Sequence, residues 1–176
     1  YKPYGRDANH ARPWAIPGTP GLEHRLGGLE KQHETGNVSY DPDNHQFMTR
    51  LRAAKVAKVA DYIPPTEVYG DDNGGVLVLG WGSTFGAIRA AVNRSRNVGI
   101  EVAHVHLRHL NPLPRDLSAI LARFERGIVP ELNEGQLAFI LAGSLGIVVE
   151  SLPKVKGKPF KIAEIESAII GEKEAS

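Results

Sequence analysis

Short apolar segments alternate with segments of helical periodicity over residues 76–171, and this alternation limits the possible folds more than any other feature. The first segment, Val76–Leu79, is an uninterrupted apolar run, as expected for a strand covered on both faces of its sheet. Strands that alternate with helices predict a small three-layer α/β domain with a mostly parallel sheet and right-handed crossovers. In such a domain, ligands and partners bind beyond the carboxyl ends of the strands.

The same patterns predict four strands and four helices in this domain. We expect the strands at residues 76–79, 101–107, 128–132 and 147–150. The helices are expected around apolar positions at helical spacing, within residues 88–95, 117–124, 135–142 and 162–169. Pro130 lacks the N–H group that a central strand needs, so the third strand is expected to lie at an edge of the sheet or to end there.

Residues 1–40 are rich in glycine, proline and histidine and show no apolar period. Such a segment buries too little surface to offset its ordering entropy. We therefore predict an extended arm or connector that is disordered or lies over a partner, with Trp14 and Ile16 as its anchors.

Residues 41–75 are predicted to form a helix and a linker. Asp41 can cap the free N–H groups of a helix, and Pro42 fits the first helical position. The helix should continue to about Tyr62 and carry a basic face, which we interpret as solvated in preference to a nucleic-acid contact. Residues 66–75 are expected to be a polar connector. The last residues, 172–176, are expected to be a tail.

The composition excludes several classes of protein. The chain has 176 residues and a net charge of +1, so it suits one domain with an arm and gives no reason to expect nucleic acid or a membrane as a partner. No apolar run is long enough to span a bilayer. Because cysteine is absent, the chain has no thiolate nucleophile and no cysteine-ligated metal or iron–sulfur site of its own. Because it begins at Tyr1 in a loop-like stretch, we expect a piece of a longer protein.

A glycine-rich turn separates the first predicted strand from its helix. Gly80–Gly86 has the spacing G-x-G-x-x-x-G, in which Gly82, Ser83 and Thr84 could contact a phosphate at the helix N-terminus. This alternative is a stand-alone module that binds NADP or coenzyme A. Against this alternative, the second predicted strand does not end in an acidic residue that could bind a ribose. We favour a tight turn in which Ser83 or Thr84 caps the helix.

The second predicted strand contains two histidines that point to one face. His104 and His106 are spaced as in some metal sites, but no carboxylate nearby completes a ligand set. We therefore interpret them as packed or hydrogen-bonded histidines beneath a helix. No serine occupies a G-x-S-x-G turn, so no nucleophile is assigned.

A polar loop follows the third predicted strand. Glu131, Asn133 and Gln136 lie between this strand and the next helix, at the edge of the sheet where ligands bind. Glu131 and Asn133 could line the cavity of a neighbouring subunit. A helix cap by Asn133 explains the loop equally well.

Several motifs in order resemble the α subunit of 2-oxoacid:ferredoxin oxidoreductases, especially the 2-oxoglutarate type. Each is weak alone, but their order and spacing match and extend over nearly the whole chain. The motifs are Gly21–His24, Gly36–Pro42 with His45, Gly80–Thr84, His106–Pro114, Val129–Leu137 and Lys154–Phe160. Residues 142–146 and the arm segment 25–35 depart from the family pattern, which affects the expected loop geometry.

This resemblance implies a transketolase C-terminal-like domain at residues 76–171, in a cytoplasmic enzyme. It implies that thiamine diphosphate and magnesium bind at an interface between an upstream pyrimidine-binding domain and a β subunit. The β subunit would carry the iron–sulfur cluster, and coenzyme A and ferredoxin would take part in the parent reaction. No residue of this chain is expected to be catalytic. The expected ligand or interface contacts are Gly82, Ser83, Thr84, Arg108, Asn111, Glu131, Asn133 and Gln136.

Overall fold

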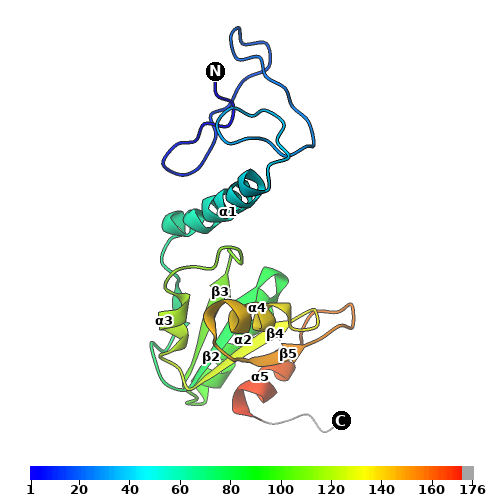
Figure 1. The fold of residues 1–176 in the computed structure, drawn as a ribbon. Helices are drawn as coiled ribbons and strands as arrows, with labels where there is room; N and C mark the ends of the chain where they lie inside the picture. The colour runs from blue at the N-terminus through cyan, green and yellow to red at the C-terminus, as the bar shows by residue number, and fades with distance from the viewer. Residues whose placement is uncertain (172–176) are drawn as a thin grey trace. The chain divides into compact units, whose positions relative to one another are not determined.

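The computed structural model describes residues 1–171, and these form two compact units (Figure 1). The first unit is Tyr1–Tyr62, and the second begins at Ile63. Among the helices of the described residues, none is both long and apolar enough to cross a membrane.

The first unit contains one long helix. Helix α1, Pro42–Lys58, continues as the 3-10 helix η1, Val59–Tyr62. The carboxylate of Asp41 accepts hydrogen bonds from the backbone N–H groups of Asp43 and Asn44, so the predicted start of the helix is confirmed. Of the apolar side chains on α1, only Met48 is fully buried.

The arm that precedes α1 forms no helix and no continuous strand. It contains two isolated bridges, Tyr4 with Glu34 and Lys31 with Val38. The Lys31 ammonium group is buried and donates to two backbone carbonyl groups within the arm. In contrast, Trp14 is 93% exposed. The arm therefore keeps its internal contacts while its largest side chain stays in solvent.

The second unit is built on a five-stranded sheet. Its strands follow the order β1-β3-β2-β4-β5. Four strands are parallel, and β1 runs antiparallel to β3, so the predicted mostly parallel α/β sheet is confirmed. The bounds are β1 Val68–Gly70, β2 Val76–Trp81, β3 Val102–Leu107, β4 Arg126–Glu131 and β5 Glu150–Pro153.

Helices cover both faces of this sheet. Helices α2, Phe85–Asn97, and α5, Ile162–Ile170, pack on one face. Helices α3, Leu117–Leu121, and α4, Gln136–Leu145, pack on the other. Alternate residues of β2 point into these two cores, which is why this strand is apolar at every position from 76 to 79. The three-layer prediction is therefore confirmed.

Strand β1 was not predicted from the sequence, because residues 66–75 were assigned to a connector. β1 is three residues long, and it is held by its backbone pairing with β3 and by polar side chains within it and just after it. The Tyr69 hydroxyl donates to Asn93 on α2 at 2.7 Å, and Asp71 forms an ion pair with Arg96 at 2.6 Å. Polar contacts of this kind leave no periodic signal in the sequence.

The position of Pro130 decides between the two expected places for it. β4 lies between β2 and β5, so Pro130 marks the end of a strand and not an edge strand. The ladder between β2 and β4 covers only Arg126–Ile128, so Pro130 lies beyond it, next to the end of the strand. Its missing N–H group therefore leaves that ladder intact.

Two element boundaries also differ from those expected. The fourth predicted strand, 147–150, begins only at Glu150, because Ile128 of β4 pairs with that residue and the chain before it has no ladder partner. The second predicted helix ends at Leu121, while Phe124 still packs against the core from the following turn.

Candidate functional site

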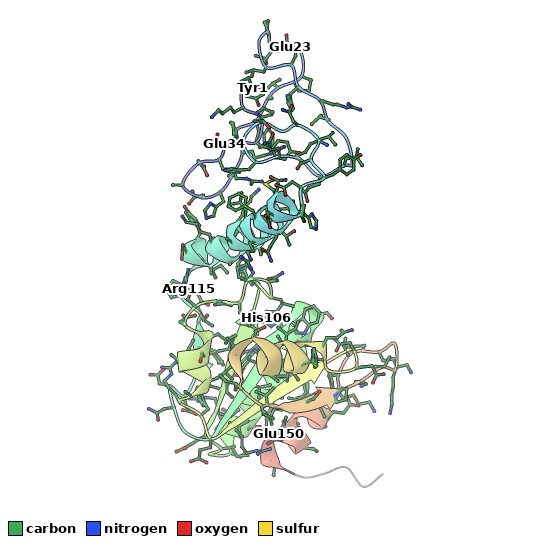
Figure 2. The ribbon with its side chains drawn as sticks, in the orientation of Figure 1. Tyr1, Glu23, Glu34, His106, Arg115 and Glu150 are labelled. Carbon is green, nitrogen blue, oxygen red and sulfur yellow. The ribbon has the colours of Figure 1, made fainter. Side chains whose placement is uncertain are left out.

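A groove of about 1030 Å³ opens at the carboxyl ends of β2 and β3. His106, near the end of β3, is labelled in Figure 2, and Glu150, at the amino end of β5, lies on the opposite side of the sheet in that view. Ligand sites of parallel α/β sheets occur at the carboxyl edge. Side chains of four elements line the groove, chiefly Tyr69, Trp81, Phe85, Arg89, His106 and Arg108.

Arg89 is held in one orientation by its neighbours. Its guanidinium carbon lies 3.5 Å from the centroid of the Tyr69 ring and 5.0 Å from that of Phe85. Its Nε donates to Nδ1 of His104 at 3.3 Å. Because the Tyr69 hydroxyl is itself bonded to Asn93, the ring beneath the guanidinium is also fixed. Stacking on two aromatic rings stabilises a cation and limits its motion.

His104 is a neutral, buried side chain at the base of the groove. Burial, together with the positive charge of Arg89, lowers its pKa to about 3. Because Nδ1 accepts from Arg89, the proton lies on Nε2, which has no acceptor among the described residues. Burial also lowers the pKa of His106, whose ring lies 5.7 Å from that of His104. The interpretation of His104 as a histidine packed beneath a helix is confirmed.

No metal site accompanies these histidines in residues 1–171. Within that part of the chain, no group of three or more histidine, aspartate or glutamate side chains is arranged to hold a metal ion.

The glycine-rich turn is explained by close packing. A Cβ atom on Gly80 would lie 2.5 Å from Cδ1 of Ile88 and 3.1 Å from Nδ1 of His106, so only glycine fits at this point. Gly82 has φ +58°, which glycine adopts without strain. The Thr84 hydroxyl donates to the carbonyl oxygen of Trp81 and accepts from its N–H group, so it closes the turn. Thr84 directly precedes α2, but its side chain makes no capping hydrogen bond with that helix, and Ser83 stays exposed, so the predicted cap by Ser83 or Thr84 is wrong.

Glu131 is fully buried at the end of β4, and its carboxylate is surrounded by donors. The indole nitrogen of Trp81 donates to it at 3.0 Å, and the side-chain amide of Asn133 at 3.2 Å. The backbone N–H groups of Leu137 and Ala138, in the first turn of α4, complete the set. Glu131 therefore occupies the positive end of α4 and joins it to β2.

The residues predicted as contacts do not all gather at one place. Gly82 and Arg108 line the groove at the ends of β2 and β3. Asn133 caps α4, since its side-chain oxygen accepts from the N–H groups of Gly135 and Gln136. The Gln136 side chain is exposed at the start of α4, and Asn111 is exposed in the loop after β3.

Three of the side chains that shape the groove received no role in the sequence analysis. Phe85 and Arg89 lie four residues apart on one face of α2, and Tyr69 comes from the unpredicted strand β1. Helical spacing after the glycine turn could have suggested the first two. Tyr69 could not be placed because its position depends on the pairing of β1 with β3.

The basic motif at the carboxyl end of β5 forms a closed loop. The Lys154 ammonium group donates to both carboxylate oxygens of Glu164, at 2.8 and 2.7 Å, and to the carbonyl oxygen of Pro159. Glu164 also accepts from the N–H group of Lys161 at the start of α5. One lysine thus ties the strand, the loop and the last helix together.

Comparison with known proteins places this chain among the α subunits of one enzyme family. It is 48% identical over 169 residues, 94% of the chain, to the 2-oxoglutarate oxidoreductase subunit KorA of Mycobacterium tuberculosis. It is 33% identical over 80% of its length to subunit alpha of a 2-oxoacid:ferredoxin oxidoreductase from Aeropyrum pernix. The chain spans 25% and 23% of these two relatives. No protein-family model matches it.

A solved structure gives the same result. The 2-oxoglutarate:ferredoxin oxidoreductase from Magnetococcus marinus, with 2-oxoglutarate, coenzyme A and succinyl-CoA bound, matches 98% of this chain with a TM-score of 0.89 and 34% identity. The match covers 30% of that chain. The resemblance indicated by the ordered motifs is therefore confirmed, and the chain corresponds to a region of the α subunit of the 2-oxoacid:ferredoxin oxidoreductases.

Proposed function

We propose that this chain is the C-terminal, transketolase-like domain of the α subunit of a 2-oxoglutarate:ferredoxin oxidoreductase. The parent enzyme converts a 2-oxoacid, coenzyme A and oxidised ferredoxin to an acyl-CoA, carbon dioxide and reduced ferredoxin. Within it, this domain supports subunit assembly and borders the active site. Alone, it is inactive.

One observation carries this proposal. The 48% identity to KorA extends over 94% of the chain, through both compact units and every motif of the sequence analysis. An identity of this level over 169 residues supports the same place in the parent subunit. Since the chain spans a quarter of KorA, the groups that carry out the reaction belong to the remainder of the complex in this proposal.

The residues described here do not fit thiamine diphosphate with its magnesium ion. Magnesium needs several oxygen ligands, and Glu67 is the only carboxylate that lines the groove. Two other polar side chains that line the groove, Arg89 and Arg108, are cations and therefore do not bind a metal ion. We therefore assign thiamine diphosphate and magnesium to the upstream pyrimidine-binding domain and the β subunit. We assign the iron–sulfur cluster to the β subunit as well; this chain has no cysteine that could ligate one.

The proposal is tested by reconstitution. The isolated chain, the full α and β subunits together, and the same pair with residues 76–171 deleted from α are assayed for reduction of methyl viologen. Each assay contains 2-oxoglutarate, coenzyme A, thiamine diphosphate and magnesium. We expect turnover only with the complete pair, and loss of the α–β complex on size-exclusion chromatography after the deletion. Turnover by the isolated chain, or a deleted pair that assembles and works normally, would contradict the proposal.

A stand-alone nucleotide-binding module remains the alternative from a different class. The packing of Gly80 against Ile88 explains one of its glycines without a phosphate. A thermal-shift assay with NADP and with coenzyme A decides between the two functions. A ligand at a hundred times its dissociation constant stabilises a protein by about 2.7 kcal/mol. We expect no shift of the isolated chain with either compound.

A further inference from the structure

The most unusual feature of the groove is an arginine that is fixed in place yet has free donors. Among residues 1–171, the only hydrogen bond of the Arg89 side chain runs from Nε to His104, and it has no ion pair. Its two terminal nitrogens therefore have no protein acceptor there. Two rings and one imidazole already hold the guanidinium, so little side-chain entropy remains to be lost on binding.

The surroundings of Arg89 favour an anion. Arg108 lines the same groove, and no hydrogen bond or ion pair of its side chain occurs in the described residues. The one carboxylate on the groove wall is Glu67, which is exposed. The neighbouring imidazole of His104 is neutral and adds no charge of its own. The fixed guanidinium fork of Arg89 matches the geometry of a carboxylate, and Arg108 adds a second positive charge to the same groove.

The aromatic walls favour a protein segment over a small anion. Tyr69 and Phe85 are 39% and 45% exposed, so both rings reach solvent at the rim. A free carboxylate or phosphate ion would bind the guanidinium and leave these rings uncovered. Tryptophan, tyrosine and arginine are the residues that dominate binding energy at protein interfaces, and all three line this groove.

We propose that the groove formed by Tyr69, Phe85, Arg89 and Arg108 is a docking site for a segment of another part of the α–β complex. The segment presents an aspartate or glutamate side chain next to an apolar side chain. The carboxylate binds the free nitrogens of Arg89, and the apolar side chain covers Phe85. This inference rests on the proposed function, because it requires the remainder of the complex.

Photo-crosslinking in the assembled complex tests the proposal. Benzoylphenylalanine replaces Glu67, on the groove wall, in the full α subunit, which is then purified with its β subunit and irradiated. Adducts are identified by mass spectrometry. The same complex carries Arg89→Gln or Arg89→Lys in parallel. Arg94→Ala is the matched control, because Arg94 lies on the same helix, is exposed and lies outside the groove.

We expect one main adduct, with a peptide that contains an aspartate or glutamate. Its yield should fall about tenfold with Arg89→Gln, less with Arg89→Lys, and not with Arg94→Ala. Circular dichroism verifies that each variant α subunit is folded. Substitution of the acidic residue in the identified peptide by its amide should reduce the adduct in the same way.

Three results would overturn the proposal. They are the absence of any protein adduct, an adduct peptide without an acidic residue, and an adduct unchanged by Arg89→Gln. In a separate experiment, inorganic phosphate or adenosine 3′,5′-bisphosphate is added to the complex before irradiation. Loss of the adduct there identifies a small anion as the occupant and also overturns the proposal. The crosslinking readout does not depend on catalysis. A complex that fails to turn over 2-oxoglutarate would therefore contradict the proposed function, while the adduct would still test the docking site.

Discussion

The indole N–H group of Trp81 donates to the buried carboxylate of Glu131 over 3.0 Å and so joins the end of β2 to the end of β4. These two strands lie side by side, and the chain leaves them in opposite directions, toward β3 and toward β5. Such a point is where open α/β sheets place their ligands. In this domain, the hydrogen-bonding groups of Trp81, Glu131 and the first turn of α4 are paired with one another at that point.

Replacement of Glu131 tests how much stability this contact supplies. Glu131→Ala leaves the indole N–H group and the first N–H groups of α4 buried without an acceptor, and each unsatisfied group costs about 1–3 kcal/mol. We expect a loss of about 3 kcal/mol for Glu131→Ala and about 1–2 kcal/mol for Trp81→Phe in urea unfolding. Glu134→Ala, exposed in the same loop, is the control and should change little. Equal stability of Glu131→Ala and Glu134→Ala would refute the role of the carboxylate.

Alanine substitutions in the glycine turn should have opposite effects. Gly80→Ala places a methyl group 2.5 Å from the Ile88 side chain, so we expect a loss of about 2 kcal/mol. Gly86 lies in helix α2 with open space around it, and Gly86→Ala should raise the free energy of unfolding by about 0.5–1 kcal/mol. Urea unfolding of both variants provides the measurement. A stabilising Gly80→Ala would show that the close approach to α2 does not exist.

His104 should make the second unit sensitive to mild acid. Its pKa is about 3 in the folded state, below the ordinary histidine value of 6.5, so the unfolded chain binds the proton more readily. The contribution of His104 to the free energy of unfolding is therefore complete above its pKa in the unfolded chain. It is lost as the pH falls toward its pKa in the folded state. Between pH 7 and pH 5 we expect a loss of about 2 kcal/mol from this group.

Urea unfolding of His104→Gln at both pH values checks this expectation. The variant starts from a different stability, so the slope with pH is compared and not the absolute value. The slope should be clearly smaller for His104→Gln than for the parent chain. His109→Gln, which removes an exposed imidazole, is the control. An unchanged slope in His104→Gln would mean that the imidazole is protonated within the folded domain.

Lys154 should hold the loop between β5 and α5. Its side chain is 10% exposed and its ammonium group bonds to Glu164 and to the backbone of Pro159, so Lys154→Met removes charge-assisted bonds and leaves the Glu164 carboxylate with the backbone N–H group of Lys161 as its donor. We expect a loss of about 2 kcal/mol and faster trypsin cleavage after Lys156. Lys158→Met, in the exposed part of the same loop, is the control and should change neither the stability nor the cleavage, because trypsin does not cut before Pro159. Cleavage rates that do not change in Lys154→Met would contradict this account.

The fold was predictable where the physical signal is local. The apolar run of β2, the cap of α1 at Asp41 and the helical spacing of Ile88 with Val92 each depend on nearby residues, and all three are confirmed. The strand β1 was missed because it depends on pairing with residues more than thirty positions away, Ala103–Val105. The sequence left open whether Pro130 marks an edge strand or a strand end, because the extent of a ladder is a property of two strands, which one strand's sequence does not contain.

The groove was predictable only in part for the same reason. Gly82 and Arg108 follow strands directly, so the rule for parallel sheets places them at the carboxyl edge. Arg89 received no role from the sequence, since one arginine on a helix surface is ordinary. Its importance arises from Tyr69, which reaches it from β1. The family resemblance supplied the parentage, and the packing of these side chains supplied the candidate contact.

The strand order has a consequence for synthesis on the ribosome. β2 lies at the centre of the sheet, yet both of its neighbours, β3 and β4, come later in the chain. The apolar segment 76–79 therefore leaves the exit tunnel first and has no partner strand until residues 102–107 have been translated. Pairings between distant segments form slowly. The nascent chain should thus depend on chaperones from the appearance of β2 until β4 is complete.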